Sequence, residues 1–397
     1  MQMLQTTALD PESLGRGTTA KAPLAARTAH REVVCLLGLP IDVVDLKAAV
    51  SRVTHAIRMR ERCLVSTPNV NFLVAAQKSA EFRRSVQRSQ LVLADGSPVI
   101  WLSKLMGAPL PERVSGADLF EALRHGQPAS AKVPVKVFFF GGPPGAAESA
   151  SEQLGTGARE DASVGVGFDE AGFGSISDMS SPEQIDKINA SAADFLVVSL
   201  GAAKGQSWIL NNLERVTTPV ISHLGAVVNF VSGRVTRAPV WVRRLHLEWL
   251  FRIWQEPALW RRYAGDAITA LLMFASHVAP FIVWNRVLWL ARDLRGVKTD
   301  RLGAVWELTG AHPRLVLSGA LSRGNLAPLR VALEQMPHDH RVEVDCSALV
   351  SLDLYGLGLL ASAFDTHDEQ AFTFSGLHWS LAKLLRFAGA GYLLERG

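Results

Sequence analysis

Residues 33–230 alternate short runs of β-branched, aromatic and leucine residues with longer amphipathic runs, and this alternation constrains the fold more than any other feature. It is typical of an α/β fold, in which an open sheet is flanked by helices. In such sheets ligands bind beyond the carboxyl ends of the strands, where this chain places glycine and polar residues. The predicted strands are Val33–Leu37, Cys63–Ser66, Leu91–Ala94, Val135–Phe140, Phe195–Leu200 and Val220–Ser222.

A second unit follows Arg295. Strand-like runs at 315–317, 341–345 and 372–374 alternate with helical runs near 326–335, 355–364 and 380–387, which predicts a compact βαβαβα unit. A chain of 397 residues is too long for one ordinary core, in agreement with more than one domain.

The chain begins with a segment of different composition. Residues 1–31 are rich in Thr, Ala, Gly and Pro and contain no long apolar run, which predicts a flexible tail and not a secretory signal peptide. The three cysteines are widely spaced and form no C-x-x-C pair, so we expect neither a disulfide framework nor a zinc site. Both observations favour the cytoplasm.

The segment 231–263, called here the Arg/Trp-rich segment, concentrates the positive charge. It holds seven Arg against Glu248 and Glu256, a net charge of +5, with four Trp interleaved. Such a segment suits anionic lipid headgroups or a pyrophosphate-linked lipid, although nucleic-acid binding or simple helix packing would use the same residues. The arginines of interest are Arg237, Arg243, Arg244, Arg252, Arg261 and Arg262.

An apolar stretch, 267–290, follows directly. It approaches the length needed to cross a bilayer, but His277, Pro280, Asn285 and Arg286 interrupt it. We expect a helix that lies in the plane of the membrane surface. The alternative is a buried helical hairpin broken at Pro280.

Two turns are candidates for chemistry. The glycine-rich loop Gly141–Gly145 joins an apolar strand to a helix-compatible run, so it could bind a phosphate with backbone N–H groups, or it could be a plain turn. Asp95 lies in an Asp-Gly pair at a strand end, where a carboxylate could act as general base or simply form a turn. We find no D-x-D pair of the kind that holds a nucleotide-bound divalent ion, so we do not expect metal dependence. The tract 337–340, with two His, is expected to be a solvated loop.

Seven motifs in order resemble those of the WecG/TagA/CpsF family of bacterial glycosyltransferases, over residues 33 to 263. They are Thr67-Pro68-Asn69, Ala94-Asp95-Gly96, Arg113-Val114-x-Gly116-x-Asp118, the loop Gly141–Gly145, Gly233-x-x-x-Arg237-Ala238-Pro239, Glu248-Trp249-x-x-Arg252 and Glu256-Pro257 with Arg262-Tyr263.

The resemblance implies inverting, metal-independent transfer of an N-acetylmannosamine-type sugar from a UDP-sugar, without a cofactor. The acceptor would be a saccharide linked to polyprenyl pyrophosphate at the inner face of the cytoplasmic membrane. Asp95 would deprotonate the acceptor hydroxyl, and the six arginines of the Arg/Trp-rich segment would bind acceptor pyrophosphate and membrane. The residues implied on the donor side are Thr67, Asn69, Gly96, Arg113, Gly141, Gly142, Gly145, Lys204 and Gln206.

One stretch departs from the family pattern. Where the family has G-x-P-K-Q-E-x-W, this chain keeps Gly201, Lys204 and Trp208 but has Ala203, Gly205 and Gln206 at the Pro, Gln and Glu positions. The departure leaves the donor open. It also keeps an alternative in view, a catalytically weakened regulatory or scaffolding protein that signals through its C-terminal unit.

Residues 304–397 resemble a STAS domain, on the run Val344-Asp345 to Gly358 and on Leu384-Leu385-x-x-Ala388-Gly389. Leu354 and Tyr355 occupy the turn where some STAS domains carry a phosphorylated serine, so we expect a docking or autoregulatory unit with a possible protein partner.

The predicted organisation is therefore a tail at 1–31, a Rossmann-like transferase domain with its Arg/Trp-rich appendage at 32–263, an apolar membrane-associated or linker helix at 264–300 and a STAS-like domain at 301–397. We expect a protein peripheral to the inner face of the cytoplasmic membrane. Nucleic acid is not expected as a partner, because no nucleic-acid motif accompanies the basic residues.

Overall fold

The computed structural model describes residues 30–125, 134–155, 163–172, 174–236, 238–239, 241–242, 248–255, 257, 259–296, 301–309, 312–336, 342–364 and 372–394. The predicted tail lies outside these residues except at its last two positions, and so does the His-containing tract 337–340.

A six-stranded parallel sheet forms the centre of the N-terminal part, in the order β4-β3-β8-β7-β5-β6. Its strands are β3 (Cys63–Ser66), β4 (Leu91–Val92), β5 (Lys136–Phe140), β6 (Val164–Asp169), β7 (Phe195–Val198) and β8 (Val220–His223). Successive side chains of a strand point to opposite faces, so Val137 and Phe139 enter one apolar core while Phe138 and Phe140 enter another. This confirms the predicted α/β architecture.

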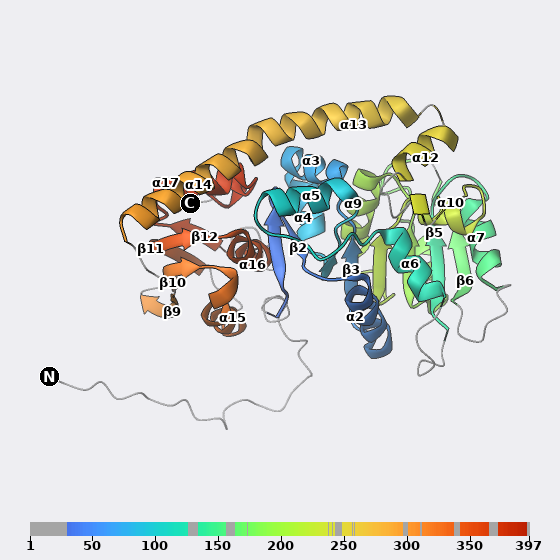
Figure 1. Cartoon of the computed structure of the whole chain (residues 1–397). Helices are drawn as coiled ribbons and strands as arrows, with labels where there is room; N and C mark the ends of the chain where they lie inside the picture. Colours follow the sequence, from blue (N-terminus) through green and yellow to red (C-terminus); the bar gives the residue numbers. More distant parts are fainter. Residues whose placement is uncertain are drawn as a thin grey trace, which may run out of the picture.

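Helices cover both faces of the sheet (Figure 1). Local signals start several of them: Asp45, Asn69, Ser79, Ser115 and Ser181 each accept a hydrogen bond from a first-turn N–H group of the helix that follows. The helices are α2 (Leu46–Met59), α3 (Val70–Lys78), α4 (Ala80–Gln87), α5 (Ser97–Leu105), α6 (Gly116–Arg124), α7 (Ala146–Gly155), α8 (Pro182–Ala190), α9 (Ala202–Asn212) and α10 (Val227–Val231).

The first predicted strand does not join this sheet. β1 (Val33–Leu36) instead pairs antiparallel with β2 (Leu39–Asp42) in a separate hairpin, through a turn in which Leu37 and Gly38 both have positive φ. All eight residues of the two strands are buried. The strand itself is confirmed, but its place was not predictable because a fully apolar run is compatible with any position that is covered on both sides.

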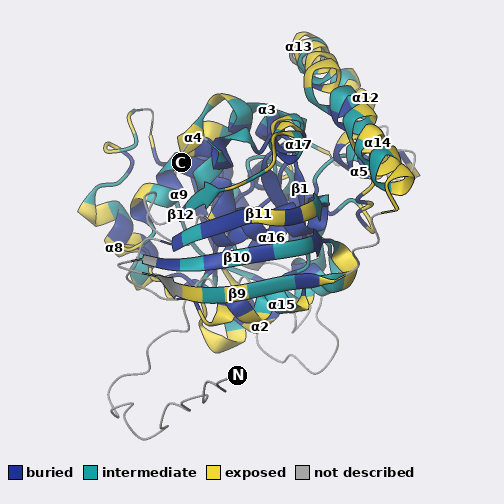
Figure 2. Ribbon diagram, turned by 90° about the vertical axis from the view of Figure 1, so that its left-hand side faces the viewer, coloured by how far each residue is buried: buried dark blue, intermediate teal, exposed yellow. Residues whose placement is uncertain are grey.

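In the C-terminal unit, the described residues form four strands in the order β12-β11-β10-β9 and three α-helices. β9 (Leu302–Thr309) was not predicted, and it adds an antiparallel edge strand to β10 (His312–Leu321). The other elements are β11 (Val342–Leu352), β12 (Phe372–Ser375), α15 (Ala327–Glu334), α16 (Leu354–Phe364) and α17 (Trp379–Phe387). Figure 2 shows the sheet of this unit with α16 behind it.

The two parts of the chain share one hydrophobic core. It joins the β1–β2 hairpin, α3 and α4 to residues of α15, α16 and α17. A Cβ atom on Gly358 of α16 would lie 2.8 Å from the backbone of Val34, so only glycine allows this approach. Tyr392 links the same parts, because its hydroxyl accepts from Gln87 Nε2 (2.6 Å) and donates to the carbonyl of Gly38 (3.1 Å).

A long helix crosses both parts along one edge of the molecule (Figure 1). It comprises α13 (Leu259–Met273), the π-helical turn η2 (Phe274–Val278) and α14 (Ala279–Leu294), and it follows α12 (Glu248–Gln255). The alternative of a hairpin broken at Pro280 is wrong. Proline lacks the N–H that an α-helix needs, and the π turn just before it accommodates the missing hydrogen bond so that the helix continues.

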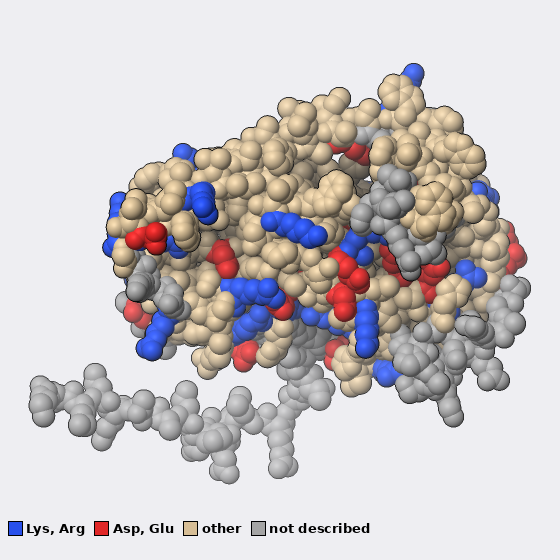
Figure 3. Space-filling view, viewed as in Figure 1, with Lys and Arg blue, Asp and Glu red and all other residues tan. Residues whose placement is uncertain are grey.

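One side of this helix is packed and the other is open. Phe281 and Val278 enter the shared core, Asp266 accepts from Asn71 (3.0 Å), and Trp284 Nε1 donates to the carbonyl of Ser380 (2.9 Å). The part of this helix from Ala264 to Leu294, 31 residues, is long and apolar enough to cross a membrane. Only 17 % of its most apolar window is buried inside the protein. Figure 3 shows few charged side chains along this edge.

Candidate functional site

The predicted turns meet at one edge of the sheet. Thr67, Asp95, Gly141 and Gly201 follow β3, β4, β5 and β7, and because all these strands are parallel their carboxyl ends lie on the same side. The turns that the sequence singled out therefore lie at the carboxyl edge of the sheet.

Asp95 is fixed on a strand-to-helix turn. Its N–H donates to the carbonyl of Pro68 (2.9 Å), and the carbonyl of the preceding Ala94 accepts from Val114 (2.9 Å). Gly96 then has φ of 97°, a conformation suited to glycine, and α5 begins at the next residue. The carboxylate is half-buried. It is thus held at the carboxyl edge of the sheet.

Thr67 and Asn69 lie on the neighbouring turn after β3. Thr67 is buried, and Asn69 caps α3 by accepting from the N–H of Phe72 (3.2 Å). The polar atoms of this turn therefore border the Asp95 turn, which Pro68 joins to it by a backbone hydrogen bond.

Arg113 organises a cluster of carboxylates near Asp95. Its guanidinium forms ion pairs with Asp118 at the start of α6 (2.9 Å) and with Glu248 at the start of α12 (3.2 Å). Burial lowers the pKa of Arg113, but Asp118, Asp95 and Glu248 outweigh it and raise that pKa overall. Arg113 thereby ties the Arg/Trp-rich segment to the site. These contacts of Arg113 are with carboxylates, and its donor-side role stays a prediction.

Three residues of the glycine-rich loop have a backbone conformation that favours glycine. Gly141, Gly142 and Gly145 all have positive φ, at 83°, 108° and 72°. The N–H of Gly145 donates to the Glu170 carboxylate (2.5 Å), and Arg234 donates to the carbonyl of Pro144. An acidic oxygen already occupies this amide, which is the hydrogen bond that a phosphate oxygen would accept.

The departing segment on α9 is part of the interior. Gln206 is buried and donates to Ser66 Oγ (3.1 Å), so its assignment to the donor is not supported by its position. A Cβ on Gly205 would lie 2.3 Å from the His223 ring, which explains why no larger residue stands there. Lys204 remains exposed and donates to the carbonyl of Gly174 (2.9 Å).

The predicted arginines of the acceptor side are described only in part. Arg237, Arg243 and Arg244 lie outside the described residues, and so do the side chains of Arg252 and Arg262. Arg261 is exposed on α13, with its guanidinium 5.8 Å from the centroid of the Trp260 ring. The four tryptophans of the segment, Trp241, Trp249, Trp254 and Trp260, are all exposed.

Sequence reasoning missed two acidic residues near the site, Glu170 and Asp42. Asp42 ends an apolar strand inside the core, and a carboxylate in that position was the available signal. Within the described ranges no group of three or more His, Cys, Asp or Glu side chains is placed to hold a metal ion.

Comparisons with known proteins agree with this geometry. The model of the "Glycosyl transferase WecG/TagA/CpsF family" matches residues 34–280, well over half of the chain, and the model "Mlab, STAS domain" matches residues 305–395. A protein of Bacillus spizizenii named N-acetylglucosaminyldiphosphoundecaprenol N-acetyl-beta-D-mannosaminyltransferase is 30% identical over 237 residues, which is 58% of this chain and 88% of that protein. A Bacillus subtilis protein of the same name is 27% identical over 209 residues, 52% of this chain and 77% of that protein. With its parallel sheet, the ordered turns at one edge and these matches, the chain belongs to the WecG/TagA/CpsF family of glycosyltransferases and carries a C-terminal STAS domain.

Proposed function

We propose that this protein transfers an N-acetylmannosamine-type sugar from a UDP-sugar to a saccharide linked to polyprenyl pyrophosphate, in the synthesis of a cell-surface polysaccharide. Residues 32–263 would carry out the transfer, and 264–300 would place it at the membrane. The observation that carries the proposal is Asp95, half-buried on a turn at the carboxyl edge of the sheet. The printed names of both relatives support this acceptor and sugar.

The proposed step is a single displacement. The acceptor oxygen attacks the anomeric carbon of the donor sugar while Asp95 takes the hydroxyl proton. The bond between that carbon and the UDP oxygen breaks, UDP leaves with the electron pair, and the configuration at the carbon inverts. Guanidinium groups of the Arg/Trp-rich segment would offset the diphosphate charge in place of a metal ion.

On the donor side we place the diphosphate at the loop Gly141–Gly145, where it would displace the Glu170 carboxylate from the amide of Gly145. Lys204, exposed in the first turn of α9, is the cationic residue in the segment that departs from the family pattern, and we propose that it contacts the donor phosphate. Because Gly205 and Gln206 serve packing, their difference from the family pattern does not argue for a lost activity.

Transfer by purified full-length protein tests the proposal. UDP release would be measured with a panel of UDP-sugars and a short-chain polyprenyl-pyrophosphate saccharide. Asp95→Asn should reduce acceptor-dependent release by about 10²–10⁴-fold, because it removes the general base. Asp186→Asn, on the exposed face of α8, is the matched control and should keep the wild-type rate. Turnover retained in Asp95→Asn would remove this residue from the mechanism.

We further propose that the long helix lies in the plane of the membrane surface. Its packed side belongs to the shared core, so a spanning orientation would have to break those contacts, whereas its open side is already apolar. The large apolar side chains exposed on it are Ile268, Leu271, Leu272, Phe274, Val283, Val287, Trp289, Leu290 and Leu294.

Sedimentation with anionic phospholipid vesicles tests this orientation. Leu271→Glu and Leu272→Glu should each weaken vesicle binding by about tenfold or more, since each replaces a leucine that would be buried in the lipid with a charged residue. Val305→Glu, at a similarly exposed apolar position on β9, should have little effect. Binding to duplex DNA in preference to vesicles would contradict the membrane assignment.

A further inference from the structure

The strand that leads to Asp95 is short and lies at the edge of the sheet. β4 contains only Leu91 and Val92, and it is the outermost strand. β3 holds its inner side, because Leu93 N–H donates to the carbonyl of Ser66 (2.8 Å). N–H groups of successive residues point to opposite sides of a strand, so Val92 N–H points away from β3. The acceptor of the Val92 N–H therefore determines how firmly β4, and with it the Asp95 turn, is held.

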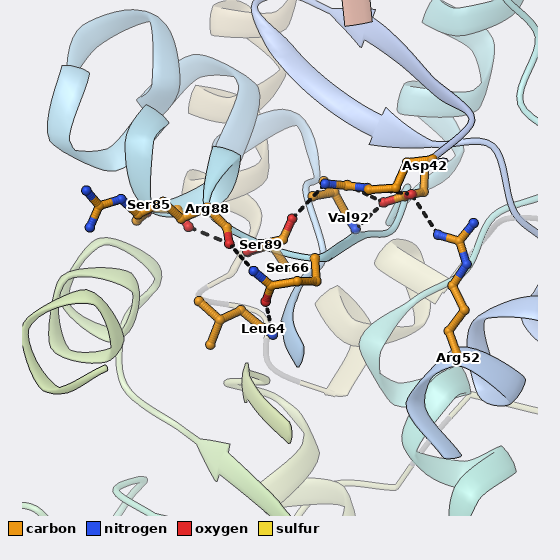
Figure 4. A network of polar contacts seen from close by, with 10 residues as sticks. Asp42, Arg52, Leu64, Ser66, Ser85, Arg88, Ser89 and Val92 are labelled. Carbon is orange, nitrogen blue, oxygen red and sulfur yellow. Dashed lines mark hydrogen bonds and ion pairs between the residues drawn. The ribbon is translucent and has the colours of Figure 1, made fainter. Parts of the chain in front are cut away.

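A carboxylate takes the place of a neighbouring strand. Asp42, at the end of β2, accepts from Val92 N–H through Oδ2 (2.7 Å) (Figure 4). The Asp42 side chain is fully buried and also pairs with Arg31 (2.6 Å) and Arg52 (2.8 Å). A buried carboxylate needs such partners to offset its lost hydration. Together, these contacts hold the Asp42 side chain in one orientation. Arg31 in turn donates to the carbonyl of Ser89, just before β4 (3.0 Å).

The C-terminal STAS domain holds the same hairpin from its other side. Arg330 of α15 donates to the carbonyl of Arg31 (2.9 Å). Gly358 of α16 lies against the backbone of Val34, and Tyr392 donates to the carbonyl of Gly38 in the hairpin turn. The hairpin is thus fixed between the STAS domain and the strand that ends at the catalytic turn.

We propose that the STAS domain is an intramolecular brace for the catalytic strand, and that Asp42 is the positioning residue through which it acts. The proposal rests on the role of Asp95 proposed above. It differs from an autoregulatory or partner-binding role, because a brace that is loosened lowers turnover, whereas an inhibitory unit that is loosened raises it.

Two variants of the intact chain test the brace from its two ends. Asp42→Asn keeps the shape of the side chain but removes its charge, and Arg330→Gln removes one hydrogen bond by which the STAS domain holds the chain next to the hairpin. The matched control is Arg323→Gln, which removes an exposed ion pair with Glu32 (2.7 Å) at the same interface without touching Asp42. The measurements are kcat, the KM of donor and acceptor, and hydrogen exchange of residues 91–95.

A misplaced base slows the chemical step more than it weakens binding. We expect Asp42→Asn to lower kcat by about tenfold or more and Arg330→Gln to lower it by a smaller factor, with each KM changed by less than about twofold. Arg323→Gln should stay within about twofold of wild type, because exposed pairs contribute little. Exchange at 91–95 should rise in the first two variants and not in the control.

Several results would overturn the brace. They are wild-type or raised kcat in folded Asp42→Asn or Arg330→Gln, an equal loss in Arg323→Gln, or a loss confined to KM. If Asp42→Asn does not fold, Arg330→Gln decides. If wild-type protein shows no turnover with any donor, the proposed function fails, and the exchange at 91–95 alone then decides whether the brace exists.

Discussion

Gly358→Leu separates two opposing physical effects at the junction between the STAS domain and the hairpin. Gly358 lies inside α16, where leucine has a better helix propensity than glycine by about 0.8 kcal/mol. If the helix were free of the hairpin, the substitution would therefore stabilise the protein.

The structure predicts that Gly358→Leu instead destabilises the protein. A Cβ at this position would lie 2.8 Å from Val34 C and 2.9 Å from Val34 Cα and Cys35 N, all of them backbone atoms that cannot rotate away. Overpacking of this kind costs about 1–3 kcal/mol, and leucine adds three further carbons, which places it at the upper end. Subtracting the propensity gain leaves a net loss of about 2 kcal/mol. A domain of about 60–100 residues, the size range of the STAS domain, loses about 4–8 °C of Tm per kcal/mol, so the Tm should fall by about 8–16 °C.

Thermal unfolding followed by circular dichroism measures the effect. Gly324→Leu is the matched control, because a Cβ on Gly324 meets nothing within 4 Å, and its Tm should change little. A Gly358→Leu protein as stable as wild type, or more stable, would refute the packing of α16 on the hairpin.

Two further predictions follow from buried titratable groups. Burial lowers the pKa of His223 although the carbonyl of Leu200 opposes it. The unfolded chain then binds the proton more readily, so stability should fall as pH drops below about 6.5, by at most about 1.4 kcal/mol per pH unit. The free energy of unfolding, measured with urea between about pH 7.5 and 5.5, should depend less on pH in His223→Gln than in wild type. Equal slopes in the two proteins would count against His223 as the cause. Burial also raises the pKa of the Cys35, Cys63 and Cys346 thiols to about 12, so iodoacetamide should label them only after unfolding; rapid labelling of native protein would contradict their burial.

Much of the fold and the location of the site could be predicted from local patterns. Short apolar runs such as Cys63–Ser66, each followed by turn residues and an amphipathic run, were enough to predict an open α/β sheet flanked by helices. Parallel connectivity then forces the turns after the strands to one edge, so Asp95, Thr67 and the glycine-rich loop could be grouped without coordinates.

The partners of individual side chains could not be predicted in this way. Gln206 and Lys204 stand two residues apart on α9, yet one is buried against Ser66 and the other is exposed. Arg113 was expected at the donor, but its ion pairs are with Asp118 and with Glu248, which lies 135 residues further along the chain. Periodicity predicts which face of a helix is buried; it does not identify the group that meets it.

The position of β1–β2 shows the same division most clearly. The sequence by itself predicted that residues 33–37 form an apolar strand, whose burial is favoured because apolar surface is unfavourable in water. Only the tertiary structure decided that this strand pairs with Leu39–Asp42, that the STAS domain covers one side of the hairpin, and that Asp42 at its end binds Val92 of the strand before Asp95. The hydrophobic effect has no direction and can be satisfied by any apolar partner, whereas a hydrogen bond between residues 50 positions apart requires the folded backbone to bring donor and acceptor together.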